Sequence, residues 1–344
     1  MRKRYFFVGL WAALVCWVWL SGCGGPKEYP LAGQTMGTTY HIKVISESKV
    51  DVAAVQTRID QRLEEINQSM STFRQDSEIS RFNAFSETGH PFQVSADFLR
   101  VMLAAREIHQ LTAGAWDGTV NPLVDVWGFG KAGPLQALPS PEAVAQARKK
   151  VGFDRIAISE DGYLTKKAGD LTVDLAAIAK GYGVDQVALL IKGMGFKDYL
   201  VEIGGEIYAA GRRLDGKPWR VGINRPQADA PMDAVYKVLQ LADAAMATSG
   251  DYRNFYRIEG RVYSHILDPR TGYPLQNGVV SATVVAANCT FADGLATALM
   301  VMGPQAGTAL LDQLPDVEGL IVVRTPSGDF ENHPSRGFAG IALE

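Results

Sequence analysis

Short apolar runs typical of β-strands alternate with helical segments from Asp154 to the end of the 344-residue chain, and this alternation constrains the fold most strongly. Helices are expected near 176–194, 291–302 and 303–314. The sequence has no internal repeat with the period of roughly 20–50 residues found in repeat proteins, so a single α+β unit is predicted. The expected strands cover 155–159, 199–204, 219–224, 234–241, 279–286 and 319–325.

The first half of the chain contains three expected helices. Apolar residues three or four positions apart predict an amphipathic helix over 52–70, after an alternating strand at 38–45. A second helix is expected over 95–111, and a third begins at Pro141 with Ser140 as its N-cap. We therefore expect mixed sheets with a packed helical subdomain.

The loop over 127–141 is the best candidate for a boundary between subdomains. It contains the letters GxGxxG at 128–133, the form of a dinucleotide-binding turn. Such a turn should open a helix, but Pro134 and Pro139 follow and no helix begins before Ser140. A turn-rich loop is the better interpretation.

The first 22 residues have the form of an export signal. The basic letters MRKR precede 16 uncharged residues over 5–20, short of the roughly 20 residues that span a bilayer. The letters LSGC then match a bacterial lipoprotein box, in which the chain is cut before Cys23 and the thiol carries a lipid; an uncleaved anchor is the alternative. Either way, the folded part is expected outside the cytoplasm and tethered to a membrane. The expected units are a signal peptide (1–22), a tether (23–31) and one folded domain (32–344).

Cysteine content and charge exclude two further possibilities. Cys16 would leave with the signal and Cys23 would be acylated, so Cys289 has no partner for a disulfide and the core alone must hold the fold. Cys289 lies in an apolar run and is predicted to be a small buried hydrophobe. The 34 basic and 37 acidic residues give a net charge of −3, which argues against a nucleic-acid partner.

Two motifs carry polar groups in otherwise apolar or small-residue surroundings. DLAAIAKGYG at 174–183 can bring Lys180 to an anionic ligand, although a closely packed helix start with a solvated lysine fits equally well. Asp293 and Thr297 lie one helical turn apart and offer hard oxygen donors that suit Mg²⁺. The competing interpretation is a capping pattern of Thr290 with Asp293, and a bond from Thr297 back to a carbonyl.

A third polar cluster lies at 247–275, in a turn-rich stretch. His265 is the only histidine within it, and its ordinary pKa suits proton transfer near neutral pH. A histidine that only bonds a backbone carbonyl is the alternative.

In their order and spacing, these segments resemble the ApbE-type flavin transferases, the FAD:protein FMN transferases. The resemblance covers almost all of the chain after the signal and implies an α+β, T-fold-like architecture. The matching segments are TMGTTY (35–40), MSTFRQDSEISRFN (70–83), GAWDGTVNPLVDVWGFG (114–130), DLAAIAKGYGVD (174–185), VEIGGEI (201–207), TSGDYRNF (248–255), SHILDPRTG (264–272) and ADGLATAL (292–299).

The resemblance also implies roles for single residues. Asp293 and Thr297 would hold Mg²⁺ together with the main-chain carbonyl of Ala177, and His265 would be the base for the incoming hydroxyl. Some relatives carry a second carboxylate where this chain has Ala296, which puts a second metal ion in doubt. The residues implied to contact FAD are Met36, Thr72, Phe73, Arg74, Asp117 and Lys180, and Lys180 would also lower the charge repulsion during the reaction.

The implied activity is Mg²⁺-dependent transfer of FMN from FAD to a threonine hydroxyl of an acceptor protein, with release of AMP. The acceptors expected from the family are membrane redox subunits of the Rnf and Nqr kind. Two alternatives are a periplasmic FAD pyrophosphatase that gives free FMN and AMP, and a non-catalytic lipoprotein that binds FAD.

Overall fold

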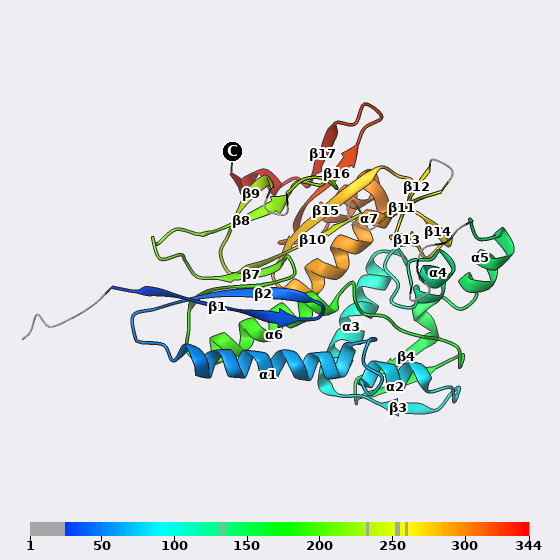
Figure 1. Cartoon of the computed structure of the whole chain (residues 1–344), viewed down its shortest axis with the longest axis horizontal. Coiled ribbons are helices and arrows are strands. Elements are labelled where there is room, and N and C mark those ends of the chain that lie inside the picture. Colours follow the sequence, from blue (N-terminus) through cyan, green and yellow to red (C-terminus); the bar gives the residue numbers. More distant parts are fainter. Residues whose placement is uncertain are drawn as a thin grey trace, which may run out of the picture.

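The centre of the molecule is an eight-stranded sheet with the strand order β1-β2-β6-β7-β10-β15-β16-β17 (Figure 1). The computed structural model describes residues 25–343 apart from 131–132, 134, 136, 232–233, 252–254 and 259–260. The strands are β1 (Lys27–Thr35), β2 (Thr38–Ser46), β6 (Asp198–Ile203), β7 (Glu206–Ala210), β10 (Ala244–Gly250), β15 (Val279–Ala286), β16 (Glu318–Arg324) and β17 (Phe330–Pro334).

Helices cover one face of this sheet and confirm the predicted α+β class (Figure 1). In α1, Val55, Ile59 and Leu63 are buried at the predicted spacing, and Asp51 caps the helix by accepting from the Ala54 N–H at 3.1 Å. The helices that pack here are α1 (Val52–Met70), α3 (Ala96–Leu111), α6 (Ala179–Gly193) and α7 (Cys289–Leu311).

The opposite face of the sheet is covered by three further strands, β8 (Trp219–Asn224), β9 (Val235–Leu241) and β18 (Ala342–Leu343). All eight residues of β15 are buried as a result, which explains its nearly continuous apolar sequence. Every strand pairing in the described part of the chain is antiparallel, so the expected mixture of strand directions is not seen there.

The expected helical subdomain lies at one end of the sheet (Figure 1). Helix α5 begins as predicted, because the Ser140 hydroxyl accepts from the Ala143 N–H at 3.2 Å. The other elements here are α2 (Glu78–Ala84), α4 (Asn121–Val126), α5 (Pro141–Arg148), β3 (Pro91–Gln93), β4 (Ile156–Ser159), β5 (Tyr163–Lys166) and a 3-10 turn (Phe153–Arg155). Short pairs β11 (Phe255–Ile258) with β12 (Arg261–Ser264) and β13 (Leu267–Asp268) with β14 (Tyr273–Pro274) lie beside it, and a second 3-10 turn (Phe338–Gly340) precedes β18.

One expected boundary is corrected. The tether expected over 23–31 is too long, because residues 27–31 belong to β1, where Leu31 is buried and pairs with Ile42. The expected helices 291–302 and 303–314 are confirmed as the two helical segments of α7, which are separated by the non-helical Gly303 (φ 78°) just before a proline. This helix is apolar and long enough to span a membrane, but most of it is buried inside the fold. The expected signal and Cys23 lie outside the described residues.

Candidate active site

The site is built where the N-terminal ends of α6 and α7 meet. Gly181 makes this contact possible, because a Cβ there would lie 2.3 Å from the carbonyl oxygen of Cys289. Each helix also caps the other. Asp293 of α7 accepts from the Gly181 N–H at 2.9 Å, and Asp185 of α6 accepts from the N–H groups of Cys289 and Thr290. The glycine next to Lys180 therefore serves close packing, as one of the two interpretations of the motif predicts.

Asp293 is nearly inaccessible, with 3% of its surface exposed, but it lines a cavity of about 390 Å³. Its Oδ1 lies 3.8 Å from the Nζ of Lys180. The alternative capping pattern within α7 is not formed, because Asn288 is the N-cap and the Thr290 hydroxyl donates to Asp185. The carboxylate of Asp293 and the ammonium group of Lys180 thus belong to the same cavity.

Glu206, at the start of β7, is the third charged group of this cavity. Its Oε1 accepts from the Nζ of Lys180 at 2.9 Å. Burial and the charge of Asp293 raise the pKa of Glu206 to about 8. Burial lowers the pKa of Lys180, but Asp293 and Glu206 together outweigh it, so the net pKa of Lys180 lies above its ordinary value. Lys180 is therefore a paired cation rather than a solvated one.

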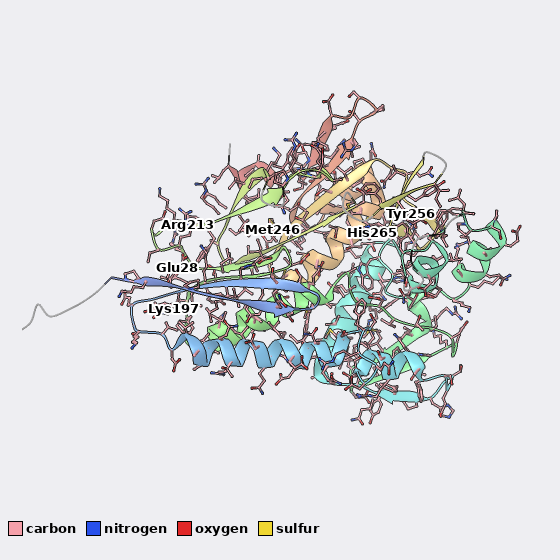
Figure 2. All side chains as sticks on the ribbon, viewed as in Figure 1. Glu28, Lys197, Arg213, Met246, Tyr256 and His265 are labelled. Carbon is pink, nitrogen blue, oxygen red and sulfur yellow. The ribbon has the colours of Figure 1, made fainter. Side chains whose placement is uncertain are left out.

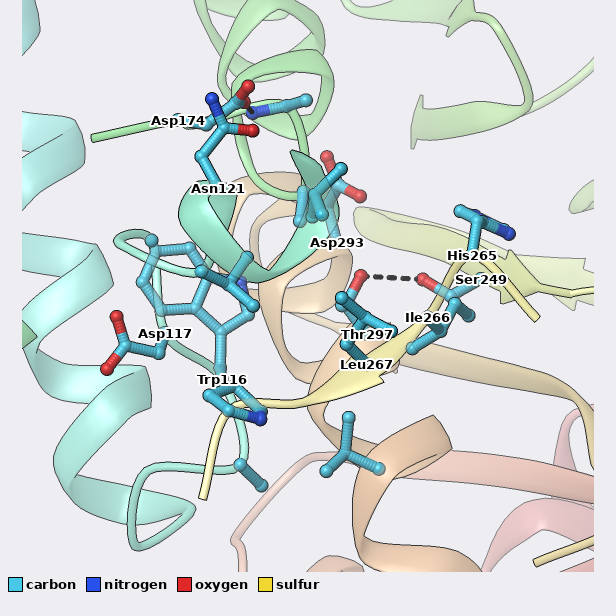
Figure 3. A pocket seen from close by; sticks show the side chains of 18 of the residues that line it. Trp116, Asp117, Asn121, Asp174, Ser249, His265, Ile266, Leu267, Asp293 and Thr297 are labelled. Atoms are coloured by element: carbon cyan, nitrogen blue, oxygen red, sulfur yellow. Dashed lines mark hydrogen bonds between the residues drawn. The ribbon is translucent and has the colours of Figure 1, made fainter. Parts of the chain in front are cut away.

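Thr297 lies one turn after Asp293 on α7 and lines the same cavity. Figure 3 shows both side chains at this cavity, with Ser249 and His265 across from Thr297. The hydroxyl groups of Thr297 and Ser249 are 2.9 Å apart and hydrogen bonded, so Thr297 has a partner on another element rather than only on its own helix. Ala177, whose main-chain carbonyl is the third predicted metal ligand, also lines the cavity.

His265 follows β12 directly and also lines the cavity. Its ring packs edge to face on Phe129, at 6.4 Å between centroids, and Phe129 stacks on Tyr256 at 4.5 Å. Figure 2 shows His265 and Tyr256 on the same side of the molecule, far from Glu28 and Lys197. The structure thus brings the predicted base into the cavity that holds Asp293 and Thr297.

Asp117 is placed differently from the other predicted residues. It borders the cavity, but its carboxylate accepts from the N–H groups of Thr119 at 2.7 Å and Phe153 at 3.1 Å. In Figure 3 its side chain points away from Thr297. Asp117 therefore organises the loop that forms this wall.

The remaining predicted FAD contacts line a second cavity of about 540 Å³. Met36 occupies the β1–β2 turn with a positive φ of 49°, and the Phe73 ring is 89% exposed. Lys180 borders both this cavity and the first one. The predicted residues gathered here are Met36, Thr72, Phe73 and Arg74.

The oxygen donors of the first cavity fit a magnesium ion. Within the described residues, no three His, Cys, Asp or Glu side chains cluster as they do at a preformed metal centre. Mg²⁺, however, usually takes one or two carboxylates and completes its shell with water and phosphate oxygens. Asp293 and Thr297 supply such donors, and Glu206 Oε2 is a buried oxygen atom with no hydrogen-bond partner among the described residues.

The sequence motifs did not identify Glu206 or Ser249 as individual residues of the site. Glu206 lies in the segment VEIGGEI, which contributes to the family resemblance, and the only local signal is an acidic residue after two glycines. Ser249 belongs to the polar cluster of 247–275 without a role of its own. Cys289 is buried, as predicted.

The fold and these two cavities define a member of the ApbE family, whose model matches residues 36–321; the chain belongs to this family. The FAD:protein FMN transferase of Vibrio cholerae is 45% identical over 95% of this chain and 96% of its own length. The FAD:protein FMN transferase of Haemophilus influenzae is 39% identical over 88% of each chain.

Solved structures agree in fold. The flavin transferase ApbE from Vibrio cholerae superposes with a TM-score of 0.83 at 43% identity, over 92% of this chain and 99% of the other. The apo form of the flavinyl transferase ApbE from Pseudomonas stutzeri gives a TM-score of 0.82 at 36% identity, over 92% and 97%. The α+β architecture is therefore that of the ApbE proteins.

Proposed function

We propose that this chain is a Mg²⁺-dependent FAD:protein FMN transferase that moves FMN from FAD to a threonine hydroxyl of an acceptor protein and releases AMP. The names of the relatives that are 45% and 39% identical support the enzyme class and the transfer of FMN to a protein. The metal, the threonine and the released AMP are what the family resemblance implies, and the oxygen donors of the first cavity support the metal.

The observation that carries the proposal is the position of Lys180 between the two cavities. FAD consists of two ring systems joined by a diphosphate. A ligand that extends through both cavities has its middle beside Lys180, Asp293 and Thr297. One cavity offers the apolar surface of Met36 and Phe73 to a flat ring.

The residues divide the reaction between them. A bound Mg²⁺ would supply charge stabilisation for the diphosphate, and Asp293, Thr297 and the Ala177 carbonyl would hold it. Lys180 lowers the repulsion that an incoming nucleophile meets at the phosphorus atom. His265 accepts the proton of the threonine hydroxyl, whose oxygen forms the new bond to the FMN phosphorus. The bond from that phosphorus to the bridging oxygen breaks, and AMP leaves with this oxygen.

Location and partners belong to the same proposal. A lipid on Cys23 would hold the folded domain on the extracytoplasmic side of a membrane, as the lipoprotein box indicates. Membrane redox subunits of the Rnf and Nqr kind are then within reach as acceptors. FAD is the second substrate, and no nucleic acid is involved.

The direct test incubates the full-length protein with FAD, Mg²⁺ and a candidate acceptor subunit. Flavin fluorescence on the acceptor band of a denaturing gel, with one AMP for each flavin, is the expected result. Free FMN and AMP without labelled acceptor would point to a pyrophosphatase. Bound FAD without AMP would point to a carrier.

A matched pair of variants on α7 sharpens this test. Thr297→Val removes one proposed oxygen donor and should lower transfer by about 100-fold or more. Thr308→Val is the control, because its hydroxyl oxygen is buried without a hydrogen-bond partner among the described residues and lies away from both cavities. Equal activity of the two variants would remove Thr297 from the metal site.

A further inference from the structure

Glu206 has one carboxylate oxygen that nothing in the described part of the chain uses. Only 4% of this residue is exposed, and its Oε1 accepts from Lys180 at 2.9 Å. Its Oε2 is buried and has no hydrogen-bond partner in that part of the chain. Burying a carboxyl oxygen without a partner is costly, so such an atom in a residue that lines a cavity indicates a ligand.

The turn before β7 places Glu206 at the wall of the cavity. Gly204 and Gly205 both have positive φ values, 61° and 103°, which reverse the chain between β6 and β7. Glu202, on the other side of this turn, provides a contrast. Its two oxygens bond the Gly205 N–H at 2.6 Å and His41 at 2.7 Å, outside the cavity.

The charges around Glu206 do not balance. Glu206 and Asp293 supply two carboxylates, whereas Lys180 supplies one ammonium group. A second positive charge in this cavity would relieve the imbalance.

We propose that Oε2 of Glu206 is a ligand of the divalent cation, in addition to Asp293 and Thr297. The assignment rests on the cation site of the proposed function and adds a residue to it. It gives this chain a second carboxylate for the cation, although Ala296 occupies the position where some relatives carry one. If Glu206 instead only holds Lys180 in place, it is a positioning residue.

The test measures the affinity of the full-length protein for Mn²⁺, as a probe for Mg²⁺, by electron paramagnetic resonance with AMP present and FAD absent. We expect Glu206→Gln to weaken Mn²⁺ binding at least about tenfold. Glu206→Asp keeps the charge on a shorter side chain and should bind with intermediate affinity. Glu202→Gln, the matched control on the same hairpin, should bind Mn²⁺ as the wild type does. Thermal unfolding checks that each variant is folded.

The outcomes separate the two roles. Wild-type Mn²⁺ affinity in Glu206→Gln, or in a folded Glu206→Asp if the first variant does not fold, would overturn the assignment. Weakened FAD binding without metal, at unchanged Mn²⁺ affinity, would assign Glu206 to Lys180 alone. No Mn²⁺ binding by the wild type would reject the cation site itself. Normal Mn²⁺ binding without FMN transfer would reject only the proposed function.

Discussion

The fully buried Lys166 and the half-buried Lys180 show how differently a fold uses the same side chain. Lys166 ends β5 in the helical subdomain, and its Nζ donates to the carbonyl oxygens of Asn83 at 3.1 Å and Phe85 at 2.8 Å. Lys180 lies at the junction of the two cavities, and its Nζ is shared by Glu206 and Asp293. One ammonium group faces backbone carbonyl groups, and the other faces the carboxyl groups of two acidic side chains.

The pKa values of the two lysines move in opposite directions for this reason. Burial lowers the pKa of Lys166 to about 8, because neutral carbonyl groups compensate only part of its lost hydration. The carboxylates around Lys180 more than offset burial and raise its pKa. Lys166 is therefore part of the scaffold, and Lys180 is a permanent positive charge available to an anionic ligand.

The largest expected effect is the loss of activity in Lys180→Met. We expect kcat/KM for AMP release from FAD to fall at least about 100-fold, because removing a charge that stabilises the transition state typically costs that much. The measurement is AMP formation at saturating Mg²⁺. A loss below tenfold would show that Lys180 contributes little to the reaction. Lys166 is expected to contribute nothing to it.

Lys166→Met should have the opposite effect: it should lower stability and leave activity unchanged. Two buried carbonyl groups lose their donor, so the free energy of unfolding should fall by about 2–3 kcal/mol at pH 7. Specific activity of the folded fraction should stay unchanged. Denaturant unfolding measures the loss, and the exposed neighbour Lys167→Met is the control. A variant as stable as the control would remove Lys166 from the scaffold.

The depressed pKa of Lys166 also predicts a pH dependence with a definite sign. Between pH 8 and about 10.5 the folded state binds fewer protons at this site than the unfolded state, so stability rises with pH there. From pH 8 to 10, the stability of the wild type relative to Lys166→Met should rise by about 2 kcal/mol, since a tenfold change in protonation corresponds to about 1.4 kcal/mol. A constant difference would show that Lys166 titrates normally.

The smallest effect is expected for Phe73, an exposed residue of the second cavity, which Lys180 also borders. Phe73→Ser should weaken FAD binding about fivefold, or about 1 kcal/mol, because one stacking surface for a flat ring is lost. The ring is 89% exposed, so the melting temperature should not change. Fluorescence titration with FAD measures the affinity, and Leu214→Ser, an exposed site outside both cavities, serves as control. Equal affinities would exclude Phe73 from the FAD site.

The parts of the fold that local chemistry dictates could be predicted from the sequence. The periodicity of α1, the Ser140 cap of α5 and the apolar run of β15 each depend on neighbouring residues alone. Helices α2 and α4 have only seven and six residues, too few for a periodic signal. Residues 27–31 form a strand because they pair with β2. Their own sequence, KEYPL, has no alternation of apolar and polar residues that would predict a strand.

The same distinction holds for the site: features set by local spacing could be predicted from the sequence, and contacts between distant segments could not. Asp293 and Thr297 lie one helical turn apart, so their shared face follows from the sequence. The role of Glu206 depends on Lys180 and Asp293, which reach it through the packing of β7 against α6 and α7. Asp117 has the residue type of a binding group but is engaged by the backbone around it, which only the folded loop shows.

The reciprocal capping of α6 and α7 bears on how this fold can change over evolutionary time. Asp293 accepts from the backbone in the first turn of α6, so a substitution there is expected to lower stability even in a descendant that no longer needs the reaction. The free oxygen of Glu206 has no such duty, and its loss would be an early mark of a retired enzyme.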